Sequence, residues 1–156
     1  MKNGIIKNYL FRAKELNGGK WVSGYYAPFA SNRGLKHAIY TGVEKGCVIP
    51  IAVDIDTIGQ YTGLHDKNDM QIFDGDIARV KYEGKAYIGV IQYDAYGVFI
   101  FIARNFGWIP LYKLLSDTDI EKATNQKPLN DYQIMAVEII GNIIDNDIEN
   151  FTGGTK

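Results

Sequence analysis

The chain has 156 residues, of which 46% are hydrophobic and 22% are charged, and its net charge at pH 7 is −1. This composition excludes an intrinsically disordered protein, and the single cysteine excludes an internal disulfide or a cysteine-based zinc site. No stretch approaches the ~20 consecutive apolar residues of a membrane span and no signal peptide is visible, so we expect a soluble intracellular protein with no membrane partner.

The first predicted element is a β-hairpin over residues 10–26. Residues 11–14 alternate apolar and basic side chains, which is the two-residue period of a strand with one buried face. Asn17-Gly18-Gly19 follows, and asparagine and glycine tolerate the positive φ of a tight hairpin turn. Residues 21–26 then supply the returning strand.

Residues 31–34 (Ser-Asn-Arg-Gly) predict a loop, and a short strand is expected at 37–40. Residues 47–53 are apolar apart from Pro50, which predicts an edge or bulged strand because proline cannot donate to a sheet ladder.

Turn-forming residues dominate the central segment, 54–68, and no helical apolar period is present. We expect an ordered loop with one or two short extended pieces. Four apolar side chains would hold it against the core: Ile55, Ile58, Tyr61 and Leu64.

Residues 72–103 predict a three-stranded meander with glycine-containing turns. A short helix is expected to begin at Ser116 or Asp117, and residues 133–144 read as a closing strand. The predicted fold is mainly β with small α content. It is an SH3-like or related small barrel, or a strongly bent antiparallel sheet, with an N-terminal hairpin and at most one short helix. We expect one domain over residues 1–145 and a flexible acidic, glycine-rich tail over 146–156.

Three parts of the chain carry a specific pattern. Residues 57–64 read T-I-G-Q-Y-T-G-L, and they are followed by Asp66-Lys67-Asn68 and by I-F-D-G-D-I at 72–77. Near the start stands Phe11-Arg12-Ala13, with Trp21 after the turn, and near the end V-E-I-I-G-N-I at 137–143.

This pattern resembles the YopX family of bacteriophages and prophages. Three residues depart from the family pattern, since Lys14 stands where it often has an aromatic residue, Asp69 where it has glycine and Asp74 where it has glutamate. Residues 116–132 look like an insertion relative to compact members. The resemblance implies a phage or prophage origin and a mainly β fold. It implies no reaction, because the family supplies none to transfer.

Five aspartates in and just after the central segment allow two interpretations: they are Asp54, Asp56, Asp66, Asp74 and Asp76. They could hold a divalent cation in a metal-dependent hydrolase, or they could fix turns by accepting backbone N–H groups. Their spacing matches no calcium loop, so we favour turns and predict no catalytic residue, no metal and no cofactor. The amide of Gln60, the ring of Tyr61 and the hydroxyl of Thr62 suit either the recognition of a base or a loop held in place by side-chain hydrogen bonds. The ligand-binding candidates are Gln60, Tyr61, Thr62, Asp66, Asp74 and Asp76.

Charge is unevenly distributed along the chain. Residues 1–45 hold eight basic and two acidic groups, whereas residues 46–156 hold nine basic and sixteen acidic groups. A basic, aromatic face for nucleic acid is one interpretation, and a mixed surface in which the two regions fold together is the simpler one. The candidates for nucleic-acid or phosphate binding are Arg12, Arg33, Lys36, Tyr25 and Tyr26.

The preferred hypothesis is a non-enzymatic phage binding protein that acts in the cytoplasm of the bacterial host. It would serve an anti-defence or host-takeover role by binding a host protein or sequestering a nucleotide. A nucleic-acid-binding module and a metal-dependent hydrolase are the alternatives. Tyrosine-rich strand edges that pair between subunits predict a homo-oligomer.

Overall fold

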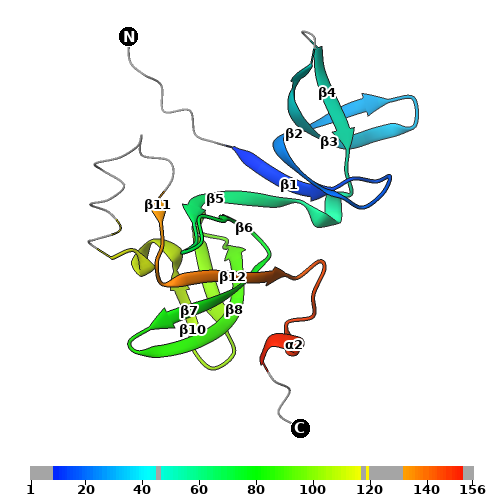
Figure 1. Cartoon of the computed structure of the whole chain (residues 1–156). Coiled ribbons are helices and arrows are strands. Elements are labelled where there is room, and N and C mark those ends of the chain that lie inside the picture. Colours follow the sequence, from blue (N-terminus) through cyan, green and yellow to red (C-terminus); the bar gives the residue numbers. More distant parts are fainter. Residues whose placement is uncertain (1–8, 45–46, 117–118, 120–131, 153–156) are drawn as a thin grey trace, which may run out of the picture. The chain divides into compact units, whose positions relative to one another are not determined.

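The computed structural model describes residues 9–44, 47–116, 119 and 132–152. The protein is mostly β, with 60% of the described residues in strands, and it divides into two compact units (Figure 1). We call Met1–Tyr61 unit 1 and Thr62–Lys156 unit 2. The expectation of one domain over 1–145 with a flexible tail stays a prediction.

Unit 1 is an antiparallel meander of β1 (Leu10–Lys14), β2 (Trp21–Ser31), β3 (Gly34–Glu44) and β4 (Cys47–Ala52) (Figure 1). The predicted first hairpin is confirmed, with Lys14 opposite Trp21 and with φ of 108° and 64° at Gly18 and Gly19. The second hairpin is much longer than expected, because β2 and β3 run in register from Tyr25 to Ser31.

Two backbone features bend this meander. A Cβ at Gly24 would collide with the backbone carbonyl of Tyr40, so only glycine lets β2 approach β3 this closely. The register of β3 against β4 then shifts between Tyr40 and Val43, and β4 with Pro50 lies at the end of the strand order. The predicted bulge and edge position of residues 47–53 are therefore confirmed.

The core of unit 1 is small. Ala13, Ile39 and Val53 are buried, and partly buried apolar side chains pack against them. The packed side chains are Phe11, Val22, Tyr26, Ile51 and Ile58.

A seven-residue strand runs through the central segment, where an ordered loop with one or two short extended pieces was expected. After the 3-10 turn η1 (Ile55–Thr57), β5 spans Gly59–His65. Its first residues pair with β1 in unit 1, and its last residues pair in parallel with β11 (Tyr132–Gln133) in unit 2. β6 (Gln71–Phe73), a few residues further along the chain, also pairs with β5, whereas β1 and β11 are remote in the chain and the sequence pattern gave no sign of their pairing.

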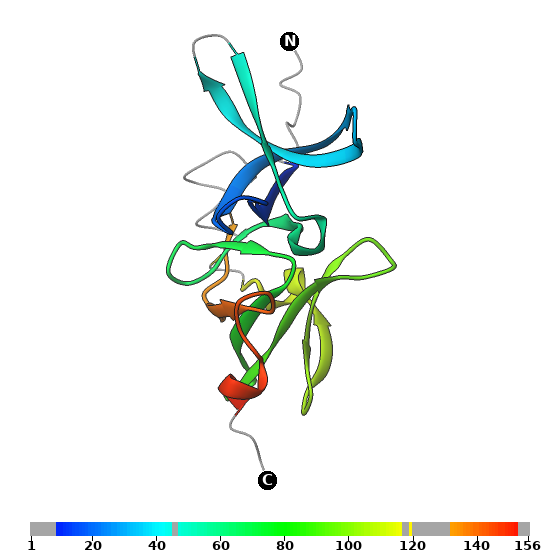
Figure 2. The same cartoon turned by 90° about the vertical axis from the view of Figure 1, so that its right-hand side faces the viewer.

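Unit 2 contains the predicted meander. Its five-stranded sheet has the order β10-β9-β8-β7-β12, and in the described part of the chain the sheets are bent without closing into a barrel. After β12, the red end of the chain turns back into α2 (Figure 2). The remaining elements are β6 (Gln71–Phe73), β7 (Asp76–Tyr82), β8 (Lys85–Tyr93), β9 (Phe99–Ala103), β10 (Gly107–Pro110), η2 (Leu111–Leu114), β12 (Val137–Asn142) and α2 (Glu149–Thr152).

The core of unit 2 is larger than that of unit 1. It is centred on Ile91 and Phe101, which are fully buried, and it draws side chains from both edges of the sheet. At Gly89 a Cβ would collide with the backbone carbonyl of Ile102, so this glycine brings β8 close to β9. The core residues are Ile72, Ala78, Val80, Ile91, Phe101, Ala103, Ile109, Leu111, Leu114, Ile134 and Val137.

A capping box marks the predicted helix start after η2. The Ser116 hydroxyl accepts the Asp119 N–H at 3.2 Å, and the Asp119 carboxylate accepts the Ser116 N–H at 2.9 Å. Asp119 is helical, while the rest of the expected helix, residues 120–123, lies outside the described residues. Within the part of the chain that the structure describes, no helix is long and apolar enough to cross a membrane.

Candidate functional site

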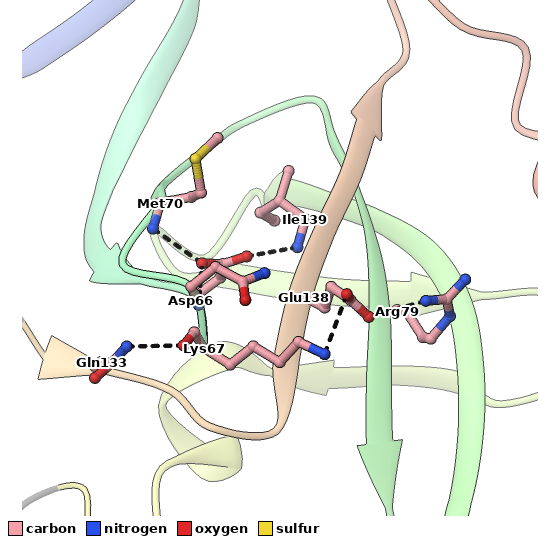
Figure 3. A network of polar contacts seen from close by, with 8 residues as sticks. Asp66, Lys67, Met70, Arg79, Gln133, Glu138 and Ile139 are labelled. Atoms are coloured by element: carbon pink, nitrogen blue, oxygen red, sulfur yellow. Dashed lines mark hydrogen bonds and ion pairs between the residues drawn. The ribbon is translucent and has the colours of Figure 1, made fainter.

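Asp66, from the family-like signature, organises the turn that follows β5. It is fully buried, and one carboxylate oxygen accepts the N–H groups of Asn68 at 2.8 Å and Met70 at 2.9 Å. The other oxygen accepts the N–H of Ile139 at 2.9 Å (Figure 3). The carboxylate thus ties this turn to the closing strand β12, 73 residues away in the chain.

A second layer of polar contacts lies beside Asp66. Glu138 contacts the Lys67 ammonium at 3.1 Å and the Arg79 guanidinium at 2.9 Å, and Gln133 donates to the Lys67 carbonyl at 3.0 Å (Figure 3). Hydrogen bonds from Lys67 and then Arg79 lower the pKa of Glu138 below its ordinary value. These contacts are on the surface and reinforce the same junction.

The other two signature carboxylates also bind backbone. Asp76 is fully buried and accepts the N–H of Phe73 at 2.7 Å, while Asp74 accepts the N–H of Tyr93 at 3.0 Å. Gly75 between them has φ of 83°, which the tight turn requires. Asp66, Asp74 and Asp76 are therefore positioned as turn-fixing groups.

The remaining ligand candidates lie along β5. Gln60 is opposite Phe11 on β1, Tyr61 is 2% exposed, and Thr62 donates its hydroxyl to the Ile72 carbonyl at 2.8 Å. Among the described residues, no group of three or more His, Cys, Asp and Glu side chains is arranged to hold a metal ion. A ligand-binding role for residues 60–62 and the three aspartates stays a prediction.

The sheet of unit 1 has one core face and one outer face. Directly opposed residues share a face, and side chains alternate along each strand. The pairs Arg12 with Ser23, Tyr25 with Tyr40, and Phe29 with Lys36 lie on the face opposite Ile39 and the core. The aromatic and basic residues of this outer face are Arg12, Lys14, Trp21, Tyr25, Phe29, Lys36 and Tyr40.

The structure thus brings together three of the five nucleic-acid candidates. Arg12, Tyr25 and Lys36 share the outer face, and Tyr25 is 54% exposed. Arg33 lies in the exposed turn that joins β2 to β3. Tyr26 lies on the core face.

Tyr26 is held in place by two neighbours. Its hydroxyl bonds to Nδ1 of His37 at 2.5 Å, and its ring packs 5.6 Å from that of Phe11. Its neighbour Tyr25 faces the other way because side chains alternate along a strand. A role for Tyr26 in binding nucleic acid stays a prediction, although its placement is that of a core residue.

Sequence reasoning missed several members of the outer face. Trp21 lies beneath two cations, with the Arg12 guanidinium 5.0 Å and the Lys14 ammonium 5.6 Å from its ring centroid. Trp21 and Phe29 both stand an even number of residues from Tyr25, so a longer β2 would have predicted all three on one face.

Unit 2 presents an open groove of about 690 Å³ beside the β9–β10 hairpin. Trp108, directly opposite Ile102, is 65% exposed, and Tyr96 in the turn before β9 is 92% exposed. Exposed rings beside a hollow are typical of recognition surfaces.

Comparison with known proteins adds one finding. A family model described as YopX protein matches residues 10–148. No curated protein matches the chain.

Proposed function

The chain belongs to the YopX family, and from that premise we propose that it is a non-enzymatic binding protein, encoded by a phage or prophage, that acts in the cytoplasm of the bacterial host. Its ligand carries phosphate and an aromatic base, either as a free nucleotide that is sequestered or as part of a nucleic acid. The outer face of unit 1 is the binding surface. An anti-defence or host-takeover role follows from removing or occupying such a ligand.

One observation carries the proposal: aromatic and basic side chains, half-buried except for the exposed Tyr25, occupy the same face of one sheet. Aromatic side chains stack on bases of any sequence, with about 1–3 kcal/mol per stacked base. Lysine and arginine attract the phosphates. Both chemistries meet where Phe29 lies directly opposite Lys36.

Net charge supports the same surface. Unit 1 holds eight basic and four acidic residues, a balance of +4, whereas unit 2 holds nine and fourteen, a balance of −5. A polyanion is therefore attracted to the unit that carries the aromatic face.

Fluorescence anisotropy with a labelled oligothymidylate tests the proposal. We expect binding that weakens steeply as salt rises, and a roughly tenfold or greater loss in the double variant Tyr25→Ala, Lys36→Gln. The matched control, Tyr96→Ala with Lys85→Gln, removes an exposed tyrosine and an exposed lysine from unit 2. No binding of the oligonucleotide or of nucleoside triphosphates at low salt would reject the proposed ligand class.

A host protein is the second candidate ligand, and the groove beside Trp108 favours it. An exposed tryptophan and tyrosine are the residue types that dominate protein interfaces. Affinity purification from host lysate should recover a stoichiometric partner with the wild type and not with Trp108→Ala. Recovery of the same partner by both proteins would remove the groove from consideration.

Self-association belongs to the same proposal. The edge strand β4 exposes Val48 and Ile49, which gives a second copy of the chain an apolar strand to contact. Light scattering after gel filtration should report a homo-oligomer that Val48→Lys weakens. A wild-type monomer at all concentrations tested would contradict it.

A further inference from the structure

We propose that the groove beside the β9–β10 hairpin of unit 2 binds an acidic amphipathic helix of a host protein, which lies next to α2 on the same face of the sheet. Such a helix would be the part of the host protein, the second candidate of the proposed function, that contacts Trp108, so this proposal rests on that candidate.

One row of directly opposed residues crosses the whole five-stranded sheet of unit 2. From β12 to β10 the row consists of Gly141, Ile77, Val90, Ile102 and Trp108. Directly opposed residues share a face, and neighbouring residues in a strand point to opposite faces. The residues that adjoin the last four in their strands belong to the buried core, so the row lies on the face that the core leaves open.

The row passes from buried to exposed along its length. Ile77 is fully buried, whereas Ile102 is 37% exposed and Trp108 is 65% exposed. The ring of Phe151 in α2 lies at the buried end, because a Cβ added to Gly141 would be 3.2 Å from its Cζ. The chain's own C-terminal segment therefore covers one end of this face and leaves the other end open.

The open end of the face is hollowed by the groove of about 690 Å³. Its lining includes Ile100 and Ile102 of β9, the turn residue Tyr96, and Trp108. Ile100 is buried, whereas the two aromatic rings are exposed. An apolar side chain that enters the groove would remove both rings from water, which is the main source of affinity at protein interfaces.

A helix is the element that fits beside α2. Ile77 in β7 is opposite the glycine under Phe151, and β9, which lines the groove, is two strands away. Strands in a sheet are about 4.8 Å apart, so this separation is about 10 Å, close to the distance between the axes of packed helices. An added strand is disfavoured, because β10 is short and ends at Pro110, which has no N–H to donate.

Charge at the groove indicates an acidic occupant. Of its described lining residues, Asp94 and Arg104 are charged. The Asp94 carboxylate accepts the N–H groups of Tyr96 at 2.9 Å and Val98 at 3.0 Å, so it is part of the turn. The side chain of Arg104 is 84% exposed and contacts Glu149 of α2 at 4.0 Å. The guanidinium thus lies between α2 and the groove, within reach of a carboxylate on either side.

The segment that already covers this face has the same chemistry. Residues 145–152 read D-N-D-I-E-N-F-T, with three acidic residues, no basic residue and an aromatic ring. Glu149 contacts Arg104 and Phe151 packs against the sheet, although unit 2 as a whole is acidic. We therefore expect the groove to bind a second acidic segment with large apolar side chains at helical spacing.

Selection from a displayed library tests this proposal on the full chain, with random peptides of about 16 residues, roughly four helical turns. We expect the enriched sequences to carry acidic residues, and apolar residues at helical spacing. Fluorescence anisotropy then measures the affinity of the most enriched peptide. Trp108→Ala should weaken its binding about tenfold or more. The matched control Tyr112→Ala, which removes another exposed ring of unit 2, should not.

Reversing the charge of Arg104 separates an ion pair from a structural effect. Arg104→Glu should weaken the peptide about threefold or more, and replacing the acidic residues of the peptide by lysine should restore binding to this variant only. The matched control is Lys113→Glu, which changes an exposed lysine outside the groove lining. Equal binding of both peptides to the wild type and to Arg104→Glu would overturn the acidic occupant.

A measurement on the wild type avoids any effect of the variants on folding. The indole N–H resonance of Trp108 should shift when the peptide is added, and that of Trp21 in unit 1 should not. A proline in the middle of the peptide should abolish binding, because it breaks a helix. Unchanged binding of the proline peptide would overturn the helix, and enrichment of basic peptides, or of none, would overturn the proposed occupant.

Host-protein capture distinguishes these failures from a failure of the proposed function. A host protein that is recovered by the wild type and lost in Trp108→Ala would leave the groove as its binding site even where the peptides overturn the acidic helix. Recovery of the same host protein by both would reject the groove and its occupant together.

Discussion

The two units of the chain use their residues differently. Unit 2 has a core cluster of eleven buried residues in its described part, whereas that of unit 1 has three. The turns of unit 2 are held by aspartates that accept backbone N–H groups, as at Asp66 and Asp76. Unit 1 instead spreads aromatic and basic side chains over an outer face. The larger buried core thus lies in one unit, and the binding surface proposed for nucleotides lies in the other.

The chain offers a direct way to test this difference, because its two tryptophans lie in different units. Trp21 reports on unit 1 and Trp108 on unit 2. In a Trp21→Phe background, the fluorescence of the remaining Trp108 follows the urea unfolding of unit 2. In a Trp108→Phe background, the fluorescence of Trp21 follows that of unit 1.

The largest effect is expected from the core of unit 2. Phe101→Ala should lower the free energy of unfolding by about 3–5 kcal/mol, because it leaves a cavity where a fully buried ring was. We expect the Trp108 transition to move much more than the Trp21 transition. Ile39→Ala in the core of unit 1 is the reciprocal change. Equal shifts of both transitions would show that the units unfold as one.

The next effect tests the carboxylate that closes unit 2. Asp66→Asn keeps one acceptor oxygen but turns an amide NH₂ toward either the Ile139 N–H or the N–H groups of the turn. A buried donor left unsatisfied costs about 1–3 kcal/mol, so the Trp108 transition should shift by that amount. The exposed Asp56→Asn is the control, and a wild-type transition for Asp66→Asn would contradict the role of this carboxylate.

A smaller effect is expected in unit 1. Tyr26→Phe removes the hydroxyl that bonds to His37 and should lower the stability of unit 1 by about 0.5–1.5 kcal/mol, the usual net value of one hydrogen bond. The Trp21 transition measures it. Tyr25→Phe changes the adjacent, exposed tyrosine and should leave that transition unchanged. A larger effect from Tyr25→Phe would reverse the assignment of the two faces.

The smallest effect concerns pH. The folded pKa of Glu138 is lowered by Lys67 and Arg79, so its contribution to stability is present above the ordinary value of 4.5 and is lost as pH falls through the folded pKa. Glu138→Gln should therefore be less stable than the wild type at neutral pH and equal to it in strong acid. A difference that persists unchanged in acid would contradict this ion-pair account.

Local signals predicted the hairpins well. Asn17-Gly18-Gly19, the Gly84 turn and the capping box at Ser116 depend on neighbouring residues only, so their chemistry can be read from short segments. The signature motif likewise predicted the family from residues 57–77 alone.

The sequence did not predict which strands pair when they lie far apart in the chain. The pairing of the central segment with β1 and β11 was not predicted, because these two strands lie far away in the chain. No spacing rule links Asp66 to Ile139, and the carboxylate acquires its role only when β12 is placed beside the turn. Such contacts depend on how the whole chain folds back on itself.

The sequence by itself determined the mainly β class, the tight turns, the edge strand with Pro50 and membership of the family. Tertiary structure alone decided which of the adjacent Tyr25 and Tyr26 faces the solvent, and that the Asp66 carboxylate accepts the N–H of Ile139 in β12. The physical reason is that a two-residue period separates the faces of a strand without saying which one is buried. Only the packing of Ile39 and its neighbours against one face made the other face the outer one.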